Sequence, residues 1–211
     1  IESRAVSEDR REAILKAAFD VLCEQGLPFV SNDVIAQRSG ASRQLIRYYF
    51  AEKEDLMIAL CDMMAEAYRD ALVGLALNAK APDRLSKMLD FYFDMLDGSP
   101  KPRDDKVYDA MLSLSAGSEA VRGSLRAGYS LLGNVVSHEI SVDYPTMPVQ
   151  DANQLSYLFV CLMYGHWKMV ASLGFAEEHK TVTRTAVDRL IASYVATPSE
   201  RVDQTKIWSR T

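Results

Sequence analysis

Four neighbouring side chains, Arg43, Gln44, Arg47 and Tyr48, have the chemistry of nucleic-acid contact and no evident use in a helical core. Arg and Gln can each form two hydrogen bonds with the edge of a base, and Arg also pairs with phosphate. Helical spacing directs these residues mostly outward, because the apolar residues between them form the opposite side of the helix. The cluster therefore predicts a helix that reads DNA.

The segment from Ser31 to Leu56 predicts two short helices that hold this cluster at an angle. Ser31 or Asn32 can cap the first helix by accepting a backbone N–H bond, and Gly40 lets the chain leave it. Ser42 can cap the second helix in the same way. The apolar side of the pair would consist of Val34, Ile35, Ala36, Leu45, Ile46, Tyr49 and Phe50. Such a pair is typical of a helix-turn-helix, whose second helix enters the major groove.

The predicted DNA-binding residues lie on or beside the second helix. They comprise Ser31, Ser42, Arg43, Gln44, Arg47, Tyr48, Tyr49 and Lys53. Base-reading side chains set sequence preference, whereas phosphate contacts weaken or strengthen binding to all sequences alike. We expect Arg43, Gln44 and Tyr48 to set affinity or sequence preference. We expect the phosphate backbone to be held mainly by Ser31, Arg47, Tyr49 and Lys53.

A longer pattern surrounds this segment. It contains an apolar first helix ending in Gly, a Ser before an Ile-Ala pair, a Gly–Ala–Ser turn, and an aromatic–Phe–x–x–Lys–Glu–x–Leu ending. The matching residues are Ile14, Ala18, Leu22, Gly26, Ser31, Ile35, Ala36, Gly40, Ala41, Ser42, Tyr49, Phe50, Lys53, Glu54 and Leu56. The run from Arg11 through Leu60 thus resembles the N-terminal domain of TetR-family transcriptional regulators. One departure is Arg47, at a position where many members carry Tyr.

The resemblance implies a dimeric repressor whose all-helical C-terminal domain binds a small effector. The remaining chain shows no comparable match, so the resemblance covers only the N-terminal part. A population shift would then couple the two sites: the effector favours a spacing of the two DNA-binding domains that no longer fits successive major grooves. The long helix predicted from Glu52 would act as the lever between the domains.

Composition is compatible with this interpretation. The 211 residues are 48% hydrophobic and 25% charged, which favours a folded, core-forming chain over a disordered one. The formal net charge is -5, yet residues 38–53 hold four cations against one acid, a local charge of +3. The charge of the contacting surface, and not the net charge of the whole chain, determines the attraction to phosphate. With no apolar run long enough to span a bilayer and no visible secretory signal, we expect a cytoplasmic protein without a membrane partner.

Helical periodicity runs through almost the whole chain and predicts an all-α fold. We expect a three-helix DNA-binding domain at 1–55, a helical effector-binding and dimerisation domain at 56–197, and a polar tail at 198–211. The predicted helices are 7–25, the two short helices of the helix-turn-helix, 52–77, 81–97, 105–116, 118–141, 149–173 and 181–196. The tail carries a lone Trp208 and is expected to be mobile or lightly docked.

Catalytic and cofactor chemistry is not indicated. The glycines never form a phosphate-binding loop, and His138, His166 and His179 lack metal-ligand spacing. Three cysteines, Cys23, Cys61 and Cys161, are interpreted as buried free thiols. The acids Asp90, Asp94 and Asp97 share a helical face and are interpreted as solvated. The sequence therefore predicts a binding protein that is not an enzyme, with no cofactor and no metal.

Adaptable and aromatic side chains are concentrated in the C-terminal part at helical spacing. Core packing explains most of them, but buried Tyr hydroxyls and Trp N–H groups need polar partners, and a ligand pocket would also use them. The predicted ligand-binding residues are Met88, Tyr92, Met111, Tyr129, Tyr164 and Trp167, with His138 and His166 as further polar groups. Few cations share these faces, so a small, largely apolar effector with one or two polar groups is favoured over a strong anion.

The last two predicted helices carry apolar stripes broad enough for two surfaces. The first stripe consists of Leu155, Leu158, Phe159, Leu162, His166, Met169, Val170 and Leu173, and the second of Ala186, Val187, Leu190, Ile191 and Tyr194. One side would pack on the body, and the other would be left exposed unless a partner covers it. A two-fold homodimer through these helices resolves this and supplies two DNA-binding domains for two half-sites.

Two other classes remain open at this point. One is a helical small-molecule-binding or scaffold protein whose basic N-terminal domain meets another protein. It would show no sequence-specific, salt-sensitive DNA affinity. The other is a helical enzyme, for which the sequence offers no acid/base or metal cluster.

Overall fold

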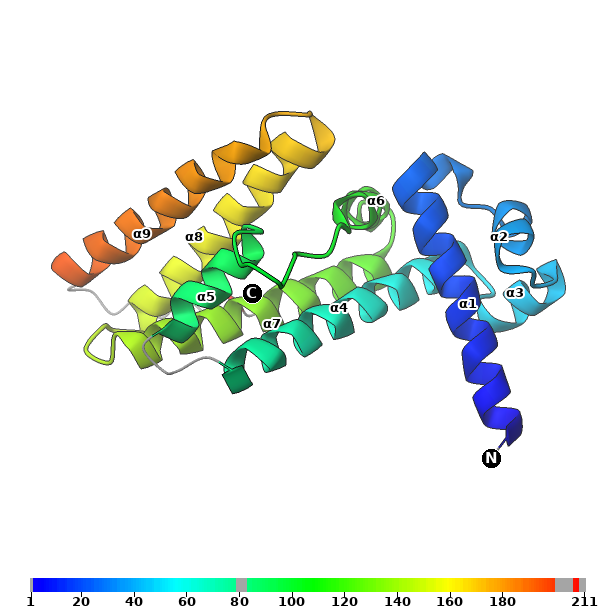
Figure 1. The fold of residues 1–211 in the computed structure, drawn as a ribbon, viewed down its shortest axis with the longest axis horizontal. Coiled ribbons are helices and arrows are strands. Elements are labelled where there is room, and N and C mark those ends of the chain that lie inside the picture. The colour runs from blue at the N-terminus through cyan, green and yellow to red at the C-terminus, as the bar shows by residue number, and fades with distance from the viewer. Residues whose placement is uncertain (1, 79–82, 200–206, 209–211) are drawn as a thin grey trace. The chain divides into compact units, whose positions relative to one another are not determined.

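The computed structural model describes residues 2–78, 83–199 and 207–208. All regular secondary structure in these ranges is helical, with no strand (Figure 1), which confirms the predicted all-α class. No helix in the same ranges is long and apolar enough to cross a lipid bilayer.

The chain divides into two compact units. Unit 1 comprises Ile1–Glu66 and Asp104–Leu125, and unit 2 comprises Ala67–Arg103 and Arg126–Thr211. Two long helices, α4 (Lys53–Asn78) and α7 (Glu119–Asp143), contribute residues to both units. The predicted domain boundary after residue 55 falls within α4, and the division of functions between domains stays a prediction.

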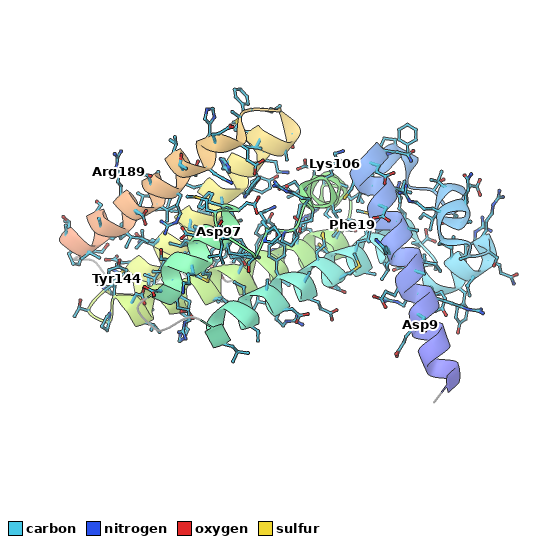
Figure 2. The ribbon with its side chains drawn as sticks, viewed as in Figure 1. Asp9, Phe19, Asp97, Lys106, Tyr144 and Arg189 are labelled. Atoms are coloured by element: carbon cyan, nitrogen blue, oxygen red, sulfur yellow. The ribbon has the colours of Figure 1, made fainter. Side chains whose placement is uncertain are left out.

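Unit 1 is built on α1 (Glu2–Gln25), α2 (Asn32–Ser39), α3 (Arg43–Tyr49) and α6 (Asp105–Ser115), with a short 3₁₀ turn, η1 (Leu27–Phe29). Helix α6 lies against α1, where the Lys106 ammonium donates to the Cys23 carbonyl (Figure 2 labels Lys106). Apolar side chains from α1, α2, α3, α6 and the first part of α4 form the core, which includes Ile14, Ala18, Leu22, Ile35, Ile46, Met57, Leu60, Val107 and Met111.

Unit 2 contains α5 (Arg84–Tyr92), α8 (Val149–Trp167) and α9 (Lys180–Ala196). Helix α8 continues into a π-helical turn, η3 (Lys168–Ser172), and a 3₁₀ turn, η4 (Glu177–His179), precedes α9. Helices α8 and α9 pack against each other. The core is rich in aromatic rings and includes Phe91, Tyr92, Phe93, Val136, Leu155, Phe159, Trp167, Val187 and Ile191.

Helix α5 ends five residues earlier than the sequence predicts. Asp94 adopts a left-handed backbone conformation, with φ of 55°, which stops the helix after Tyr92. The turn is fixed by its own polar groups, because the Asp94 carboxylate accepts from the Lys101 amide at 2.8 Å and from Arg103 at 2.7 Å. Ala81 and Pro82, where the sequence predicts the start of this helix, lie outside the described residues.

Two of the three acids interpreted as solvated are bound to cations instead. Besides Asp94, Asp90 accepts from Arg184 at 2.7 Å, and the Arg184 side chain is only 9% exposed. Arg184 also donates to Asp188 and to the Ser86 hydroxyl. This arginine, itself largely buried, therefore fastens α9 to α5.

Trp208, which the sequence placed in a mobile or lightly docked tail, is anchored on unit 2. Its indole N–H donates to the Ser156 hydroxyl at 2.8 Å, and its carbonyl accepts from Ser130 at 3.1 Å. The indole ring lies directly over Gly133 of α7, where a Cβ would come within 1.9 Å of the ring. Because Gly133 has no side chain, the indole packs directly on α7 there. This contact is called the Trp208 seat.

A pair of glycine substitutions in α7 tests this seat. Gly128 has no neighbouring atom within 4 Å of a Cβ, so Gly128→Ala should stabilise the protein by about 0.5–1 kcal/mol through helix propensity. Gly133→Ala should lower the free energy of unfolding instead, because the new methyl group displaces Trp208. In a Trp208→Ala background the same Gly133 change should become stabilising. Urea denaturation of the four variants measures this, and equal stabilisation at both glycines in the otherwise unchanged protein would contradict the seat.

Candidate functional site

Helix α3 presents one buried side and one polar, exposed side. Ile46 is fully buried and Phe50, which follows the helix, is 5% exposed, so these two residues hold α3 against the unit 1 core. Tyr48 is 79% exposed. Arg43, Gln44 and Arg47 also face solvent, as the sequence predicts. The cluster is thus a surface and not part of the packing.

The two helix starts of the helix-turn-helix are capped by serines. The Ser31 hydroxyl accepts the Val34 amide at 3.3 Å, and the Ser42 hydroxyl accepts the Leu45 amide at 3.1 Å. Gly40 closes α2 in the left-handed conformation, with φ of 70°. These local bonds set the angle at which α3 leaves α2. Ser31 and Ser42 therefore position the surface, and both also remain exposed for phosphate contact.

Two arginines of this region are already paired with acids. Arg38 forms two hydrogen bonds with Glu24 of α1, at 2.6 and 2.5 Å, and these bonds lower the pKa of the Glu24 carboxyl. Arg43 forms an ion pair with Asp33, in the first turn of α2. The local positive charge inferred from the sequence is thus partly offset by Glu24 and Asp33. Both acids lie outside the 38–53 window from which that charge was counted.

Tyr49 and Lys53, which the sequence assigns to the phosphate backbone, have partners inside unit 1. The Tyr49 hydroxyl lies 2.8 Å from the Ser7 hydroxyl and donates to the Ser7 carbonyl at 3.0 Å. The Lys53 ammonium donates to the Leu27 carbonyl at 3.2 Å and remains exposed. Tyr49 thereby ties the end of α3 to α1. The sequence did not predict this positioning role. The role of Tyr49 in phosphate contact stays a prediction.

Replacing Tyr49 with Phe separates these two roles. If the hydroxyl only ties α3 to α1, Tyr49→Phe should lower stability by about 1 kcal/mol while leaving the salt dependence of DNA binding unchanged. A phosphate contact would instead be lost together with part of that salt dependence. Thermal denaturation and DNA titrations over a salt series measure both quantities. An unchanged melting temperature with a reduced salt slope would contradict the positioning role.

The predicted ligand-binding residues do not all lie in one unit. Met111 is fully buried in unit 1, whereas the other five belong to unit 2. Met88 and Tyr92 are core residues, 4% and 5% exposed. The Trp167 indole N–H, expected to serve a ligand, donates to the Tyr92 carbonyl at 2.9 Å. Core packing therefore accounts for Met88, Tyr92 and Trp167 as they stand.

Tyr129 and Tyr164 are more accessible than the other predicted ligand-binding residues. Both are half-buried, and their rings meet edge to face with centroids 6.4 Å apart. The Lys168 ammonium lies 5.0 Å from the Tyr164 ring, and the Lys101 ammonium lies 4.6 Å from the Trp167 ring. Aromatic faces in unit 2 thus already accept positive charge. Of the two predicted histidines, His166 is buried and His138 is exposed.

The cysteines differ in exposure, contrary to the expectation of three buried thiols. Cys61 is buried, Cys23 is partly buried and Cys161 is exposed on α8. Burial raises the pKa of the Cys61 thiol to about 11, so it stays protonated at neutral pH. Within the described ranges, no group of three or more His, Cys, Asp or Glu side chains could hold a metal ion.

A known protein family matches the part of the chain that runs from within α1 to within α4. Residues 14–60 match the family described as bacterial regulatory proteins, tetR family. Over 81 residues the chain is 35% identical to the HTH-type transcriptional regulator BetI of Rhizobium meliloti, a match covering 38% of this chain and 40% of that protein. The match thus spans about two fifths of the curated relative's length.

Solved structures share the fold over most of the chain. A TetR transcription regulator from Haloarcula marismortui superimposes with a TM-score of 0.73 at 20% identity, covering 88% of this chain and 98% of that one. A transcriptional regulator from Saccharomonospora viridis, solved in complex with choline, gives a TM-score of 0.72 at 20% identity over 88% and 96% of the two chains. The match in the helix-turn-helix confirms the resemblance inferred from sequence. Residues 14–60 of this chain thus carry the N-terminal domain of the family described as bacterial regulatory proteins, tetR family.

Proposed function

We propose that this protein is a DNA-binding transcriptional repressor that a small effector releases from its operator. The observation that carries the proposal is the exposed polar side of α3, held by the buried Ile46 and Phe50. An exposed Arg and Gln at the N-terminal end of a capped second helix match the way a helix-turn-helix reads base edges. Such a protein would act in the cytoplasm, where it meets the chromosome.

The side chains of this surface take different roles. Arg43, Gln44 and Tyr48 would read or contact bases, because they lie at exposed positions of α3. Arg47 and Lys53 are exposed cations and would contact phosphates. Ser31 and Ser42 would contribute through their exposed side chains at the two capped helix starts. We assign no catalytic step to these residues, and the relatives named above are transcriptional regulators.

We infer a homodimer through α8 and α9. The apolar residues of α8, of η3 with the residue that follows it, and of α9 that keep exposed surface are called here the α8–α9 face: Leu158, Leu162, Met169, Leu173, Val182 and Leu190. Met169 is 51% exposed, Leu173 65% and Val182 68%, so three large apolar side chains of these segments lie largely in water. A second copy packed on this face would remove them from water. Two copies would also present two α3 helices to two half-sites of an operator.

The effector would bind in unit 2 beside Tyr129 and Tyr164. These rings are half-buried and lie next to each other, so part of their surface is available to a ligand. A small, weakly polar or cationic molecule suits this place, because the Tyr164 ring already accepts the Lys168 ammonium. The choline held by the Saccharomonospora regulator is a molecule of this kind. Binding would shift the population toward a state in which the two DNA-binding domains no longer fit the operator.

Selection of binding sites from random duplex DNA tests the proposal. The wild-type protein should enrich one motif arranged as two half-sites about one helical turn apart. An effector found by thermal-shift screening should raise the melting temperature and weaken operator affinity by the factor through which the operator weakens effector binding. Failure to enrich any motif would leave a helical small-molecule-binding or scaffold protein. A stabilising compound that leaves DNA affinity unchanged would remove only the allosteric part.

A further inference from the structure

The first residue of α3 is held by an acid from the neighbouring helix. The Nε of Arg43 forms an ion pair with the Asp33 carboxylate, and the two side chains are 65% and 63% exposed. Asp33 lies in the first turn of α2, and Arg43 is the first residue after the Ser42 cap. The pair therefore lies on the surface that would face DNA, at the start of the proposed recognition helix.

Folding stability does not explain this pair. An ion pair between two exposed side chains contributes little, because water and salt screen it. A cation in the first turn of a helix is also unfavourable, since the partial positive charge of the helix lies there. Asp33 alone would suit the start of α2 for the same electrostatic reason. What needs an explanation is the placement of Arg43 and the direction in which Asp33 holds it.

The geometry of guanidinium gives that explanation. A carboxylate bound at Nε restricts the rotation of the planar group and leaves its outer edge, formed by one N–H of Nη1 and one of Nη2, directed away from the carboxylate. These two nitrogens match the O6 and N7 acceptors of guanine in the major groove. We propose that Asp33 is a positioning residue that orients Arg43 toward a guanine and so determines specificity at one base of each half-site. The inference rests on the proposed DNA-reading function.

The charge of Asp33 has a second consequence. A carboxylate beside the DNA repels phosphates and offsets the positive charge of Arg43, so it lowers affinity for DNA of any sequence. Asp33 thus raises selectivity while it weakens non-specific binding. Removing it should change these two quantities in opposite directions. Loss of folding would lower both of them together.

The experiment compares variants on a duplex carrying the selected motif and on duplexes with the guanine replaced. Wild-type protein should prefer guanine by roughly tenfold to a hundredfold, the discrimination expected of one bidentate arginine contact. Asp33→Ala should reduce this preference to a few-fold and bind random DNA more tightly. Asp33→Asn retains an acceptor for Nε without the charge, and should keep an intermediate preference. Arg43→Lys should weaken the guanine preference, because a lysine ammonium has no planar group for Asp33 to orient.

The matched control is Glu24→Gln. It removes the charge from another exposed carboxylate–arginine pair of unit 1, the one with Arg38, and should leave every base preference unchanged. Melting temperatures of all variants monitor folding. An Asp33→Ala protein that keeps the wild-type guanine preference, or that loses preference equally at all positions, would overturn the inference and leave the proposed function standing. A wild-type protein that enriches no motif would overturn both.

Discussion

Replacing Arg184 with Ala is expected to destabilise the protein by about 3 kcal/mol, because breaking a buried ion pair leaves its partners without compensation. The Arg184 side chain is 9% exposed and bridges Asp90 and Ser86 of α5 to Asp188 of its own helix. This loss of unfolding free energy is at the low end of what is found for broken buried ion pairs, because Asp188 is 59% exposed and stays in contact with water. Chemical denaturation followed by circular dichroism measures the loss.

Two further variants give this prediction its controls. Arg184→Lys keeps the charge but loses the fork of donors, so its stability should fall between those of the wild type and Arg184→Ala. Lys16→Ala removes an exposed ion pair with Asp20, in which the lysine is 75% exposed, and should cost less than about 1 kcal/mol. If Arg184→Ala and Lys16→Ala lose the same stability, the network does not hold α9 on α5.

Introducing a charge on the α8–α9 face should produce a monomer with weak operator binding. Met169 is suited to the test, because it is 51% exposed and a glutamate there does not enter the core. Met169→Glu should be a folded monomer by light scattering. Its operator affinity should fall by about 10²–10⁴-fold, since the two half-sites are no longer bound by one linked pair.

Leu131→Glu is the control for this variant. Leu131 is also an exposed apolar residue, 56% exposed, but it lies on α7 and outside the proposed face. It should leave the oligomeric state and the operator affinity unchanged. Phe159, although it belongs to the same sequence stripe, is 1% exposed and would report on folding instead. A wild-type protein that is monomeric at micromolar concentration would contradict the dimer directly.

The helix-turn-helix could be predicted from sequence because its signals are local. Ser31 and Ser42 lie three residues before the amides that they cap, and Gly40 supplies the one left-handed residue that ends α2. Helical periodicity then identifies Ile46 as buried and Tyr48 as exposed, as observed. The same few residues therefore predicted which side of α3 is exposed to solvent.

The polar contacts that join distant segments could not be predicted in this way. Asp90 and Arg184 lie 94 positions apart, and the periodicity of α5 alone made Asp90 look solvated. Tyr49 and Ser7 lie 42 positions apart, so the sequence did not show that the hydroxyl is bonded inside unit 1. The stop of α5 at Asp94 depends on the same kind of contact, with Lys101 and Arg103.

The ligand-binding prediction was limited by another ambiguity. Helical spacing groups aromatic and Met side chains on inner faces, but packing and ligand contact require the same residue types. In the structure, Trp167 satisfies its N–H on the Tyr92 carbonyl, which the sequence could not reveal. Tyr129 and Tyr164 remain the residues whose substitution should change effector affinity without unfolding unit 2.

Titration of the selected duplex and a scrambled duplex over a series of salt concentrations tests the central claim most directly. The protein should bind the selected duplex at least about 10³-fold more tightly than the scrambled one, and both affinities should fall linearly on a log–log plot against salt. Arg47→Ala should reduce the salt slope on both duplexes alike. Equal affinity for the two duplexes, or affinity that does not respond to salt, would contradict DNA reading by α3.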